Sequence, residues 1–276
     1  GFIGKNLLRK INKKTNHISV ISRKNKRNQN KINFIYSDIK NIKKKILYLK
    51  SLKPSILIHL AWEGIPDYGL KISKKNLSQQ KIFFREINKL KTIKKIIVTG
   101  SCFEYGLLKG CYSETSNIKV KTPFSEAKIN LYKFLKKNLN PSVSLVWLRL
   151  FYVYGKGQRT KGLIPYLLKN IQKNRKIVLN EPNAGRDFVN VNDVYKAILL
   201  FLKINKHGIY NVGNGKAFTP LFLAKYLIKK TGSSSQLIYK KGKKKILFYG
   251  KNNKLKKLGW KPNYDIRNGL VELLKK

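Results

Sequence analysis

The stretch VTGSCFEYG (98–106), read with PFSEAK (123–128), says most about the fold and the chemistry of this chain. The apolar start of the first stretch predicts the end of a buried strand, and Ser101 places a hydroxyl there. In the second stretch an aromatic residue, Phe124, comes four positions before Lys128. A hydroxyl, an aromatic residue and a lysine in this order are typical of sites that interconvert carbonyls and alcohols. Such chemistry uses a tyrosine hydroxyl, and this chain has phenylalanine in that place.

Short apolar runs alternate with helical patterns over the first half of the chain, which predicts βαβ units and a parallel sheet. Strands are expected at 17–22, 32–36, 55–60, 95–99 and 142–148, and helices from Gly4 onward, at 77–90 and at 123–135. The pattern is less regular after residue 150. There, helices are expected at 164–171, 193–202, 220–231 and 266–275, and short strands at 177–179 and 209–212.

These patterns divide the chain into two lobes of an α/β fold. A dinucleotide-binding lobe with a doubly wound parallel sheet is predicted over residues 1–149, and a smaller α/β substrate lobe over 150–276. The segment 193–202 is expected to pack back on the first lobe. The basic, turn-rich segment 232–245 is expected to be an exposed connection.

The chain carries 61 lysines and arginines against 12 acids, a formal net charge of +49. A charge of this size is often found in nucleic-acid-binding proteins. Here, however, the lysines are spread along the whole chain together with many asparagines and isoleucines, as in a gene whose composition has drifted toward A and T. We therefore expect no specific nucleic-acid partner, and nonspecific binding of polyanions only as a side effect. The same field would attract a negatively charged substrate.

No apolar run approaches the ~18 residues that span a bilayer, so no membrane insertion is expected. The two cysteines, Cys102 and Cys111, have neither the spacing of a metal site nor that of a disulfide framework. We expect no metal site, and the expected compartment is the reducing cytoplasm. The chain begins at Gly1, contains no methionine and shows no leader pattern. We therefore expect that its natural N-terminal segment is missing.

Candidate cofactor residues follow the predicted strands and helices. Four residues open the first predicted helix: Gly1, Phe2, Ile3 and Gly4. Glycines there permit a tight turn and let backbone amides approach a pyrophosphate. Arg23 follows the strand 17–22 where NAD-preferring proteins place an acid, and this favours NADP because a guanidinium pairs with the 2′-phosphate. NAD stays possible, since Arg23 has the alternative of being one more surface cation. Asp38 is expected either to meet the adenine amino group or to cap a helix.

The redox chemistry needs three side chains. A tyrosine phenol moves the proton at the substrate oxygen, a lysine lowers the pKa of that phenol and binds the nicotinamide ribose, and a serine or threonine orients the carbonyl. Ser101 and Lys128 fill two of these roles, while Phe124 occupies the tyrosine position. Tyr132, four residues before another lysine, is expected to be a surface residue. Two tyrosines are the nearest candidates for a substitute acid: Tyr105 and Tyr112.

The chain resembles the extended short-chain dehydrogenases/reductases, the NAD(P)-dependent nucleotide-sugar epimerase/dehydratase family. The resemblance runs nearly from end to end through GFIG (1–4), HLA (59–61), SCFEYG (101–106), PFSEAK (123–128), LRLFYVYG (148–155), RDFVNVNDV (186–194), YNVG (210–213) and LGWKP (258–262). It implies a Rossmann-like fold with Leu60 and Ala61 beside the cofactor. It also implies that Arg186, and secondarily Asn211, hold the diphosphate of a nucleotide sugar, which Ser101 would also contact.

Within this family the stretches HLAWEG (59–64) and GSCFEYG (100–106) are most similar to reductases of nucleotide-linked 4-keto-6-deoxysugars, in which NADPH delivers hydride to C4. Cys102 and Phe103 stand where the family's dehydratases carry an Asp-Glu pair, so dehydration is not expected. Two alternatives stay open: a C4 epimerase, and a non-catalytic remnant or binding subunit, which Phe124 would explain. Relatives commonly dimerise through two helices, here 77–90 and 123–135, so a homodimer is expected.

Overall fold

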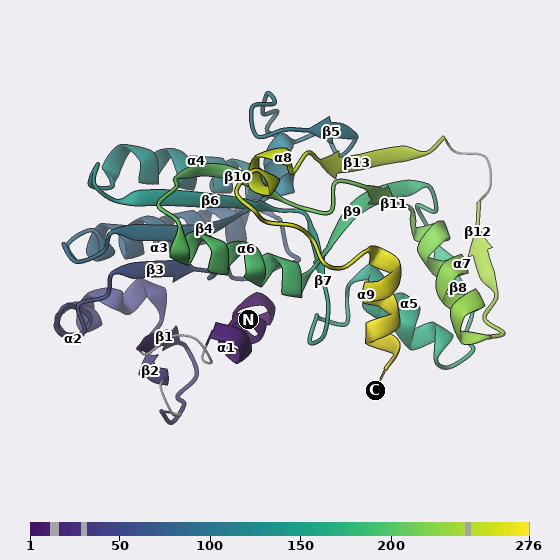
Figure 1. Ribbon diagram of the computed structural model, residues 1–276, viewed down its shortest axis with the longest axis horizontal. Coiled ribbons are helices and arrows are strands. Elements are labelled where there is room, and N and C mark those ends of the chain that lie inside the picture. Colours follow the sequence, from purple (N-terminus) through teal and green to yellow (C-terminus); the bar gives the residue numbers. More distant parts are fainter. Residues whose placement is uncertain (12–16, 29–31, 241–243, 276) are drawn as a thin grey trace.

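The computed structural model describes residues 1–11, 17–28, 32–240 and 244–275. Its main parallel sheet has the order β10 (Gly208–Val212), β6 (Ser144–Leu150), β4 (Lys95–Ser101) and β3 (Ile56–His59), as Figure 1 shows. A second parallel pair, β1 (Ile18–Ser22) and β2 (Ile32–Tyr36), lies beyond the β3 edge. The register places Ile97 of β4 between Ile58 of β3 and Val146 of β6. The predicted α/β fold with a parallel sheet is confirmed.

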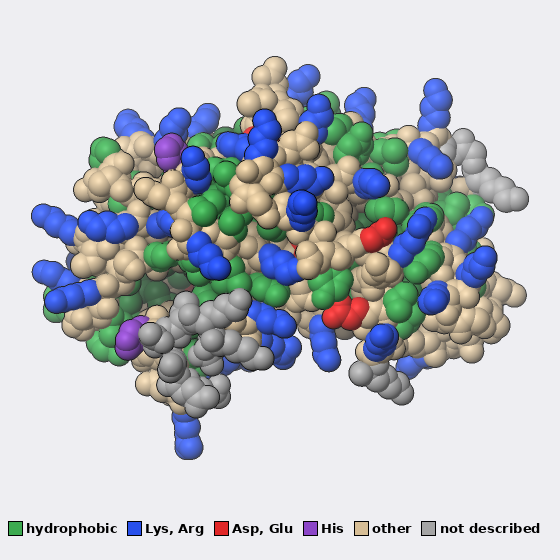
Figure 2. Space-filling view, in the orientation of Figure 1, with side chains coloured by type: hydrophobic (Ala, Val, Ile, Leu, Met, Phe, Trp, Pro, Cys, Tyr) green, Lys and Arg blue, Asp and Glu red, His purple; other side chains and the backbone are tan. Residues whose placement is uncertain are grey.

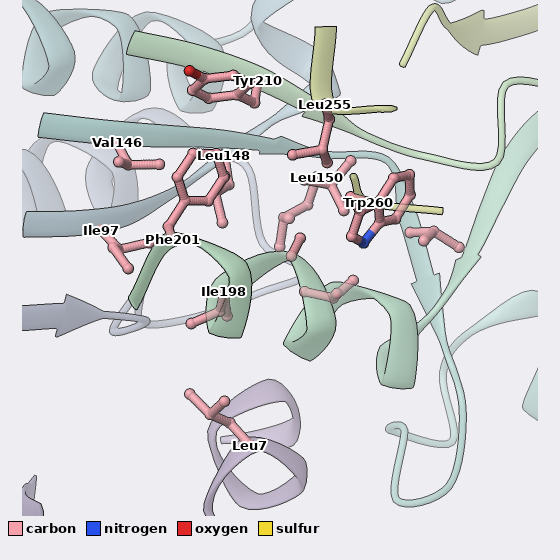
Figure 3. Close-up of a cluster of buried hydrophobic side chains, with 14 of the residues drawn as sticks. Leu7, Ile97, Val146, Leu148, Leu150, Ile198, Phe201, Tyr210, Leu255 and Trp260 are labelled. Carbon is pink, nitrogen blue, oxygen red and sulfur yellow. The ribbon is translucent and has the colours of Figure 1, made fainter. Parts of the chain in front are cut away.

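Helices cover both faces of this sheet, as a doubly wound fold requires. α1 (Phe2–Ile11) and α6 (Val191–Lys203) lie on one face, and α3 (Leu70–Ile87) and α4 (Pro123–Asn138) lie on the other. On the first face Val146 and Leu148 of β6 are buried with Phe201 of α6 (Figure 3). On the second face Trp147 is buried with Phe83 of α3. Successive residues of β6 therefore enter two separate apolar layers, because side chains alternate along a strand.

Side-chain caps start the two elements that carry the site. The Thr122 hydroxyl accepts a hydrogen bond from the Ser125 amide at 3.1 Å and starts α4. At the end of β4, the Ser101 hydroxyl accepts from the Phe103 amide at 3.2 Å, while the Ser101 amide donates to the Glu104 carboxylate at 2.7 Å. This reciprocal cap turns the chain from β4 into a short 3-10 helix, η2 (Cys102–Tyr105).

The second lobe has its own sheet and helices. Its sheet has the order β11 (Ala217–Phe218), β9 (Ala184–Asn190), β13 (Ile246–Gly250) and β5 (Gly110–Tyr112), and β7 (Tyr152–Tyr154) also pairs with β9. One apolar cluster joins β9 to α5 (Leu163–Ile171), α7 (Pro220–Thr231) and α9 (Ile266–Leu274). A further parallel pair joins β8 (Ile177–Leu179) to β12 (Leu237–Tyr239). β12 lies within the segment 232–245, so the prediction of a plain connection there is wrong.

Two elements of the second half lie with the first lobe. α6 packs against α1 over the main sheet, as predicted for 193–202. β10 also returns, because it forms the sheet edge next to β6, with Tyr210 opposite Leu148. The predicted division at residue 149 stays a prediction. The remaining elements are η1 (Ile39–Lys45), α2 (Ile46–Ser51) and α8 (Asn253–Lys256).

The surface is dominated by cations. Figure 2 shows Lys and Arg side chains over the whole visible face, with few acids among them. Among the helices that the structure describes, none is long and apolar enough to cross a membrane. The described residues also hold no group of three His, Cys, Asp or Glu side chains suited to a metal ion. Cys102 is buried and Cys111 is exposed, and both are free thiols. The expected cytoplasmic location stays a prediction.

Candidate functional site

A cavity of about 3010 Å³ follows the carboxyl ends of β1, β3 and β4 and continues to β7 and β9 of the second lobe. Open α/β sheets bind ligands at this edge. The cavity brings together nearly all predicted site residues: Gly1, Phe2, Ile3, Gly4, Arg23, Asp38, Leu60, Ala61, Ser101, Phe124, Lys128 and Arg186. Asn211 is the one predicted site residue outside its lining.

Ser101 lies on the cavity wall at the end of β4. The hydrogen bond from the Phe103 amide uses a lone pair of its Oγ and leaves the O–H as a donor. The Glu104 carboxylate holds the Ser101 amide from behind. The hydroxyl is therefore held in place and can still donate a hydrogen bond to an oxygen in the cavity.

Lys128 and Phe124 lie one turn apart on α4. The Lys128 Nζ donates to the Thr99 carbonyl at 2.9 Å and lies 3.9 Å from the centre of the Trp62 ring. Burial lowers the pKa of Lys128 to about 7, and the Glu104 carboxylate opposes this shift. The Phe124 side chain is also buried, with its ring 5.9 Å from the same Nζ. The position that would need a phenol thus holds an apolar ring beside a weakly basic amine.

Four more aromatic residues surround Phe124, and we call these five residues the aromatic wall. The ring centres of Trp62, Tyr68 and Phe103 lie 5.5, 4.9 and 6.1 Å from that of Phe124. Tyr152 of β7 completes the wall with its ring 6.0 Å from Phe103. All five line the cavity, and two of them, Tyr68 and Tyr152, carry hydroxyl groups.

The first turn of α1 lies on the same cavity. A Cβ at Gly1 would meet no atom within 4 Å, and a Cβ at Gly4 would meet only Leu60 at 3.8 Å. Open space therefore adjoins the backbone amides of the helix N terminus, and the residues fit a dinucleotide phosphate. The surroundings are positive, because four cationic side chains line the same part of the molecule: Lys5, Arg23, Lys26 and Arg159.

Arg23 and Asp38 both line the cavity but already have partners. The Arg23 guanidinium pairs with the Glu63 carboxylate, which Lys75 also contacts at 3.0 Å. A phosphate at Arg23 would therefore have to compete with Glu63. Asp38 caps η1 by accepting from the Lys40 amide at 3.1 Å. The capping alternative for Asp38 is confirmed, and its contact with adenine stays a prediction.

Arg186 lies on β9, at the second-lobe end of the cavity. Its guanidinium donates to the Gly185 carbonyl at 3.1 Å, lies 3.8 Å from the Glu181 carboxylate and is 6.0 Å from the centre of the Tyr152 ring. Asp187 is not its partner, because the Asp187 carboxylate is fully buried and accepts hydrogen bonds from three backbone amides. Arg186 therefore forms no surface pair with its neighbour Asp187, and its guanidinium stays near the cavity.

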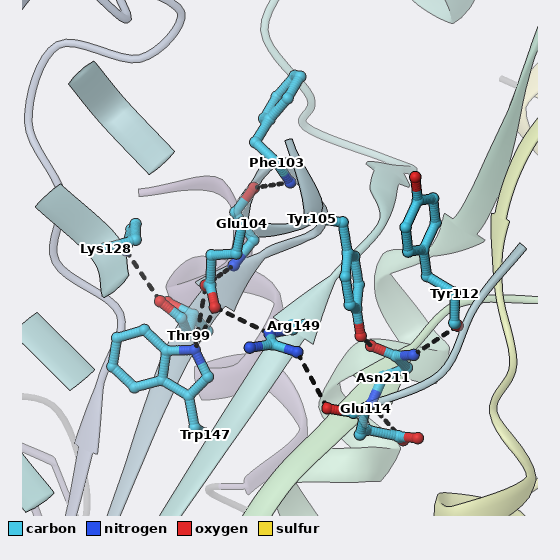
Figure 4. A network of polar contacts seen from close by, with 11 residues as sticks. Thr99, Phe103, Glu104, Tyr105, Tyr112, Glu114, Lys128, Trp147, Arg149 and Asn211 are labelled. Carbon is cyan, nitrogen blue, oxygen red and sulfur yellow. Dashed lines mark hydrogen bonds and ion pairs between the residues drawn. The ribbon is translucent and has the colours of Figure 1, made fainter. Parts of the chain in front are cut away.

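Asn211 belongs to a buried network behind the cavity (Figure 4). Its side-chain oxygen accepts from the Tyr105 hydroxyl at 2.6 Å, and its amide donates to the carbonyls of Tyr112 at 3.1 Å and Lys251 at 3.0 Å. The expected contact of Asn211 with a diphosphate is corrected, because both side-chain N–H donors, which a diphosphate would need, are already bonded to backbone carbonyls. Tyr105 and Tyr112 stack at 4.8 Å outside the cavity lining, so neither is placed as a substitute acid.

Glu104 connects this network to Ser101. Its carboxylate accepts from the Arg149 Nε at 2.8 Å and from the Trp147 Nε1 at 3.0 Å, and all three side chains are buried. A Cβ at position 100 would overlap the Trp147 indole and the Glu104 carboxylate. Gly100 is therefore the residue that lets these groups approach the end of β4.

Sequence reasoning gave Trp62 no role of its own, although it lies in the family-like stretch HLAWEG (59–64), and it missed Tyr68. Both lie in the loop WEGIPDYG (62–69) between β3 and α3. The available signal was two aromatic residues in a polar, glycine-containing loop directly after a strand expected beside the cofactor. Tyr132, predicted to be a surface residue, is half-buried with its ring 5.3 Å from Trp147, so that prediction is wrong.

Residues 1–213 of the chain match the sequence family described as the NAD dependent epimerase/dehydratase family. The chain aligns with a CDP-abequose synthase of Salmonella typhimurium over 299 positions, gaps included, at 29% identity. The match covers 100% of this chain and 95% of that protein.

Solved structures agree in fold. A UDP-glucose 4-epimerase from Thermotoga maritima with UDP-glucose has a TM-score of 0.83 at 22% identity, covering 98% of this chain and 93% of its own. A dTDP-glucose 4,6-dehydratase from Streptomyces venezuelae with NAD has a TM-score of 0.83 at 18% identity, covering 100% and 93%. The chain therefore belongs to the NAD-dependent epimerase/dehydratase family, the extended short-chain dehydrogenase/reductase enzymes whose motifs its sequence carries.

Proposed function

We propose that this chain is a nucleotide-sugar-modifying enzyme that reduces a nucleotide-linked 4-keto-6-deoxysugar. The observation that carries the proposal is that Ser101, Phe124 and Lys128 face one cavity, which reaches Arg186 at its other end. The full-length similarity to a protein named for CDP-abequose synthesis supports a nucleotide sugar as the substrate. The shared fold of an epimerase solved with UDP-glucose supports the same class of ligand.

Three polar groups of the cavity then have tasks. Ser101 donates a hydrogen bond to the keto oxygen at C4, and Lys128 holds the nicotinamide ribose. Arg186 pairs with the diphosphate, for which it gives up a long contact with the exposed Glu181. A bound reduced nicotinamide supplies the hydride. The aromatic wall packs on the apolar side of the sugar, where a 6-deoxy carbon has no hydroxyl that would lose a hydrogen bond.

We propose NADP as the favoured cofactor, with NAD as the alternative. Arg23 at the end of β1 supports NADP, because its side chain lines the cavity and would exchange Glu63 for a 2′-phosphate. The presence of NAD in a solved dehydratase of the same fold keeps the alternative open. Replacing Arg23 with Ala should raise the KM for NADPH about tenfold and leave that for NADH unchanged. Equal effects on both cofactors would contradict the preference.

The direct test is oxidation of NADPH with a nucleotide 4-keto-6-deoxysugar, followed by the loss of nicotinamide absorbance. The full chain is compared with its Phe124→Tyr variant. A phenol at position 124 should raise the rate by ~10²–10⁴ if no other group supplies the proton, and by far less if another group does. Absence of turnover by both proteins would refute the proposed substrate class.

Two alternatives have specific support. A C4 epimerase would consume no net NADPH, and tightly retained NAD in the purified protein would favour it. A non-catalytic nucleotide-sugar-binding subunit is favoured by the buried Phe124, since its ring cannot transfer a proton. That alternative expects turnover by the Phe124→Tyr variant alone.

We also propose that the chain forms a homodimer through α3 and α4. These helices pack side by side on one face of the main sheet, and α3 exposes Leu70 and Ile82. Multi-angle light scattering would give the mass of the particle, and Ile82→Lys should shift a dimer toward the monomer. A monomeric wild-type protein would contradict this assembly.

A further inference from the structure

Phe124 leaves the cavity without its expected proton donor, and Tyr68 lies directly beside it. Tyr68 lies in the loop between β3 and α3 with its ring 4.9 Å from that of Phe124 and 5.2 Å from that of Phe103. It lines the cavity together with Ser101 and Lys128. Its phenol therefore lies in the aromatic wall directly beside Phe124.

The Tyr68 hydroxyl is available. Within the described part of the chain it has no hydrogen-bond partner, and it is accessible from the cavity. Its surroundings favour the protonated form, since burial and then the Cys102 thiol raise the pKa of Tyr68. Tyr152 is the other hydroxyl of the aromatic wall, but its ring lies beside the Arg186 guanidinium, at the diphosphate end.

The loop that carries Tyr68 is anchored on α3. Asn76 accepts from the Glu63 amide at 2.8 Å and donates to the Glu63 carbonyl at 3.1 Å. Gln80 donates to the Ala61 carbonyl at 2.9 Å. Buried polar side chains therefore hold the loop over the cavity, as an orienting scaffold for a reacting group would.

We propose that Tyr68 is the catalytic acid of this chain and supplies the proton that Phe124 cannot. The inference rests on the proposed carbonyl reduction. A bound reduced nicotinamide would supply the hydride: as its own C–H bond breaks, a C–H bond would form at C4 of the sugar and the carbonyl π pair would move to O4. The O–H bond of Tyr68 breaks as its proton passes to O4, which gives the alcohol. Solvent water in the open cavity then returns a proton to the Tyr68 phenolate.

The kinetic test uses four proteins: wild type, Tyr68→Phe, Phe124→Tyr and the double variant. Tyr68→Phe should lower kcat for the keto sugar ~10²-fold or more, and Phe124→Tyr in the same chain should restore it. Tyr36→Phe is the matched control, because Tyr36 is exposed on β2 and does not line the cavity. A Tyr68→Phe variant with wild-type kcat would overturn the inference.

The second readout is binding without turnover. Calorimetry compares UDP-, CDP- and dTDP-glucose with the matching nucleoside diphosphates. Loss of the Tyr68 hydroxyl should weaken the best nucleotide sugar about 5–10-fold and leave its diphosphate unchanged, as for one hydrogen bond to the sugar. Equal weakening of both ligands would show that Tyr68 only supports the loop, which overturns the inference.

The two failures are distinguishable. Turnover that depends on Phe124→Tyr and not on Tyr68 would refute the role of Tyr68 and keep the proposed function. Silence of all four proteins, or no binding of any nucleotide sugar, would refute the proposed function, and the role of Tyr68 with it.

Discussion

Two polar clusters lie back to back at the carboxyl end of β4. They differ in how many of their hydrogen-bond donors and acceptors have partners within the protein. Behind the strand, Glu104, Arg149, Tyr105 and Asn211 form a buried network with partners for each side chain (Figure 4). In front of the strand, Ser101, Lys128 and Tyr68 face the cavity, and the hydroxyls of Ser101 and Tyr68 keep their donor capacity.

The comparison shows which polar residues build the site and which ones act in it. A buried polar group whose bonds are all made inside the protein has nothing left for a ligand, and removing one partner is costly. A polar group that faces a cavity with a free donor contributes little to folding and can bind a ligand. Ser101 belongs to both clusters, because its amide meets Glu104 while its hydroxyl faces the cavity.

The largest loss of stability is expected when the buried network behind β4 is broken. Arg149→Met removes the 2.8 Å bond to Glu104 from a pair whose side chains are 2% and 1% exposed. The Glu104 carboxylate then stays buried without its cation, and the free energy of unfolding should fall by ~3–5 kcal/mol. Urea unfolding at pH 7 measures this loss.

A matched control uses a partly exposed pair. Glu86→Gln removes the contact with Lys89 in a pair whose side chains are 13% and 61% exposed, and should change the free energy of unfolding by no more than about 0.5 kcal/mol. If the Arg149 and Glu86 variants lost similar stability, the closed network would not be the scaffold that its geometry indicates.

The next effect compares one substitution in both clusters. Tyr105→Phe leaves the buried Asn211 oxygen without its donor and should cost ~1–2 kcal/mol of unfolding free energy. Tyr68→Phe removes a hydroxyl with no partner within the described chain, so it should cost less than about 0.5 kcal/mol. Thermal and urea unfolding of both variants check the difference. The reverse order of stability would contradict the contrast between the two clusters.

The smallest expected effect is a pH dependence of the unfolding free energy, which comes from Lys128 in the group that faces the cavity. Burial lowers the folded-state pKa of Lys128 to about 7, below the ~10.4 of an unfolded lysine. Between these values the unfolded chain binds more protons, so the stability contributed by this group rises with pH. Relative to Lys128→Met, the wild-type protein should gain about 1 kcal/mol of unfolding free energy between pH 7.5 and 8.5.

Glu104 and the other titrating groups are present in both proteins, so the difference between the two pH profiles isolates Lys128. Parallel pH profiles of the two unfolding free energies would show that the Lys128 amine stays fully charged in the folded protein. A stability difference that falls as the pH rises would show that folding raises the pKa of Lys128, against the prediction.

Most of the first lobe could be predicted because its signals are local. Apolar runs at 95–99 and 142–148 and the helix predicted over 123–135 became β4, β6 and α4; β4 and α4 end two and three residues later than predicted, and β6 is shifted by two residues. Hydrophobic periodicity and caps act over a few neighbouring residues, so they are visible without the fold.

The second lobe was less predictable because its strands are short and their partners are distant. β13 pairs with β5, which places Phe248 opposite Gly110, and β12 pairs with β8. Of these four strands only β8 was predicted, at 177–179, while β5, β12 and β13 are three to five residues long and carry little pattern of their own. Their pairing depends on loops that close only in the folded chain.

By itself, the sequence determined the parallel sheet, the family and the side chains available at positions 101, 124 and 128. Those features depend on the spacing of neighbouring residues. Tertiary structure decided which polar groups stay free of protein partners: Asn211 accepts a hydrogen bond from Tyr105, and Tyr68 packs beside Phe124. These contacts join residues from different strands and loops. No local sequence pattern indicates whether a hydroxyl will bond to another protein group or face a cavity.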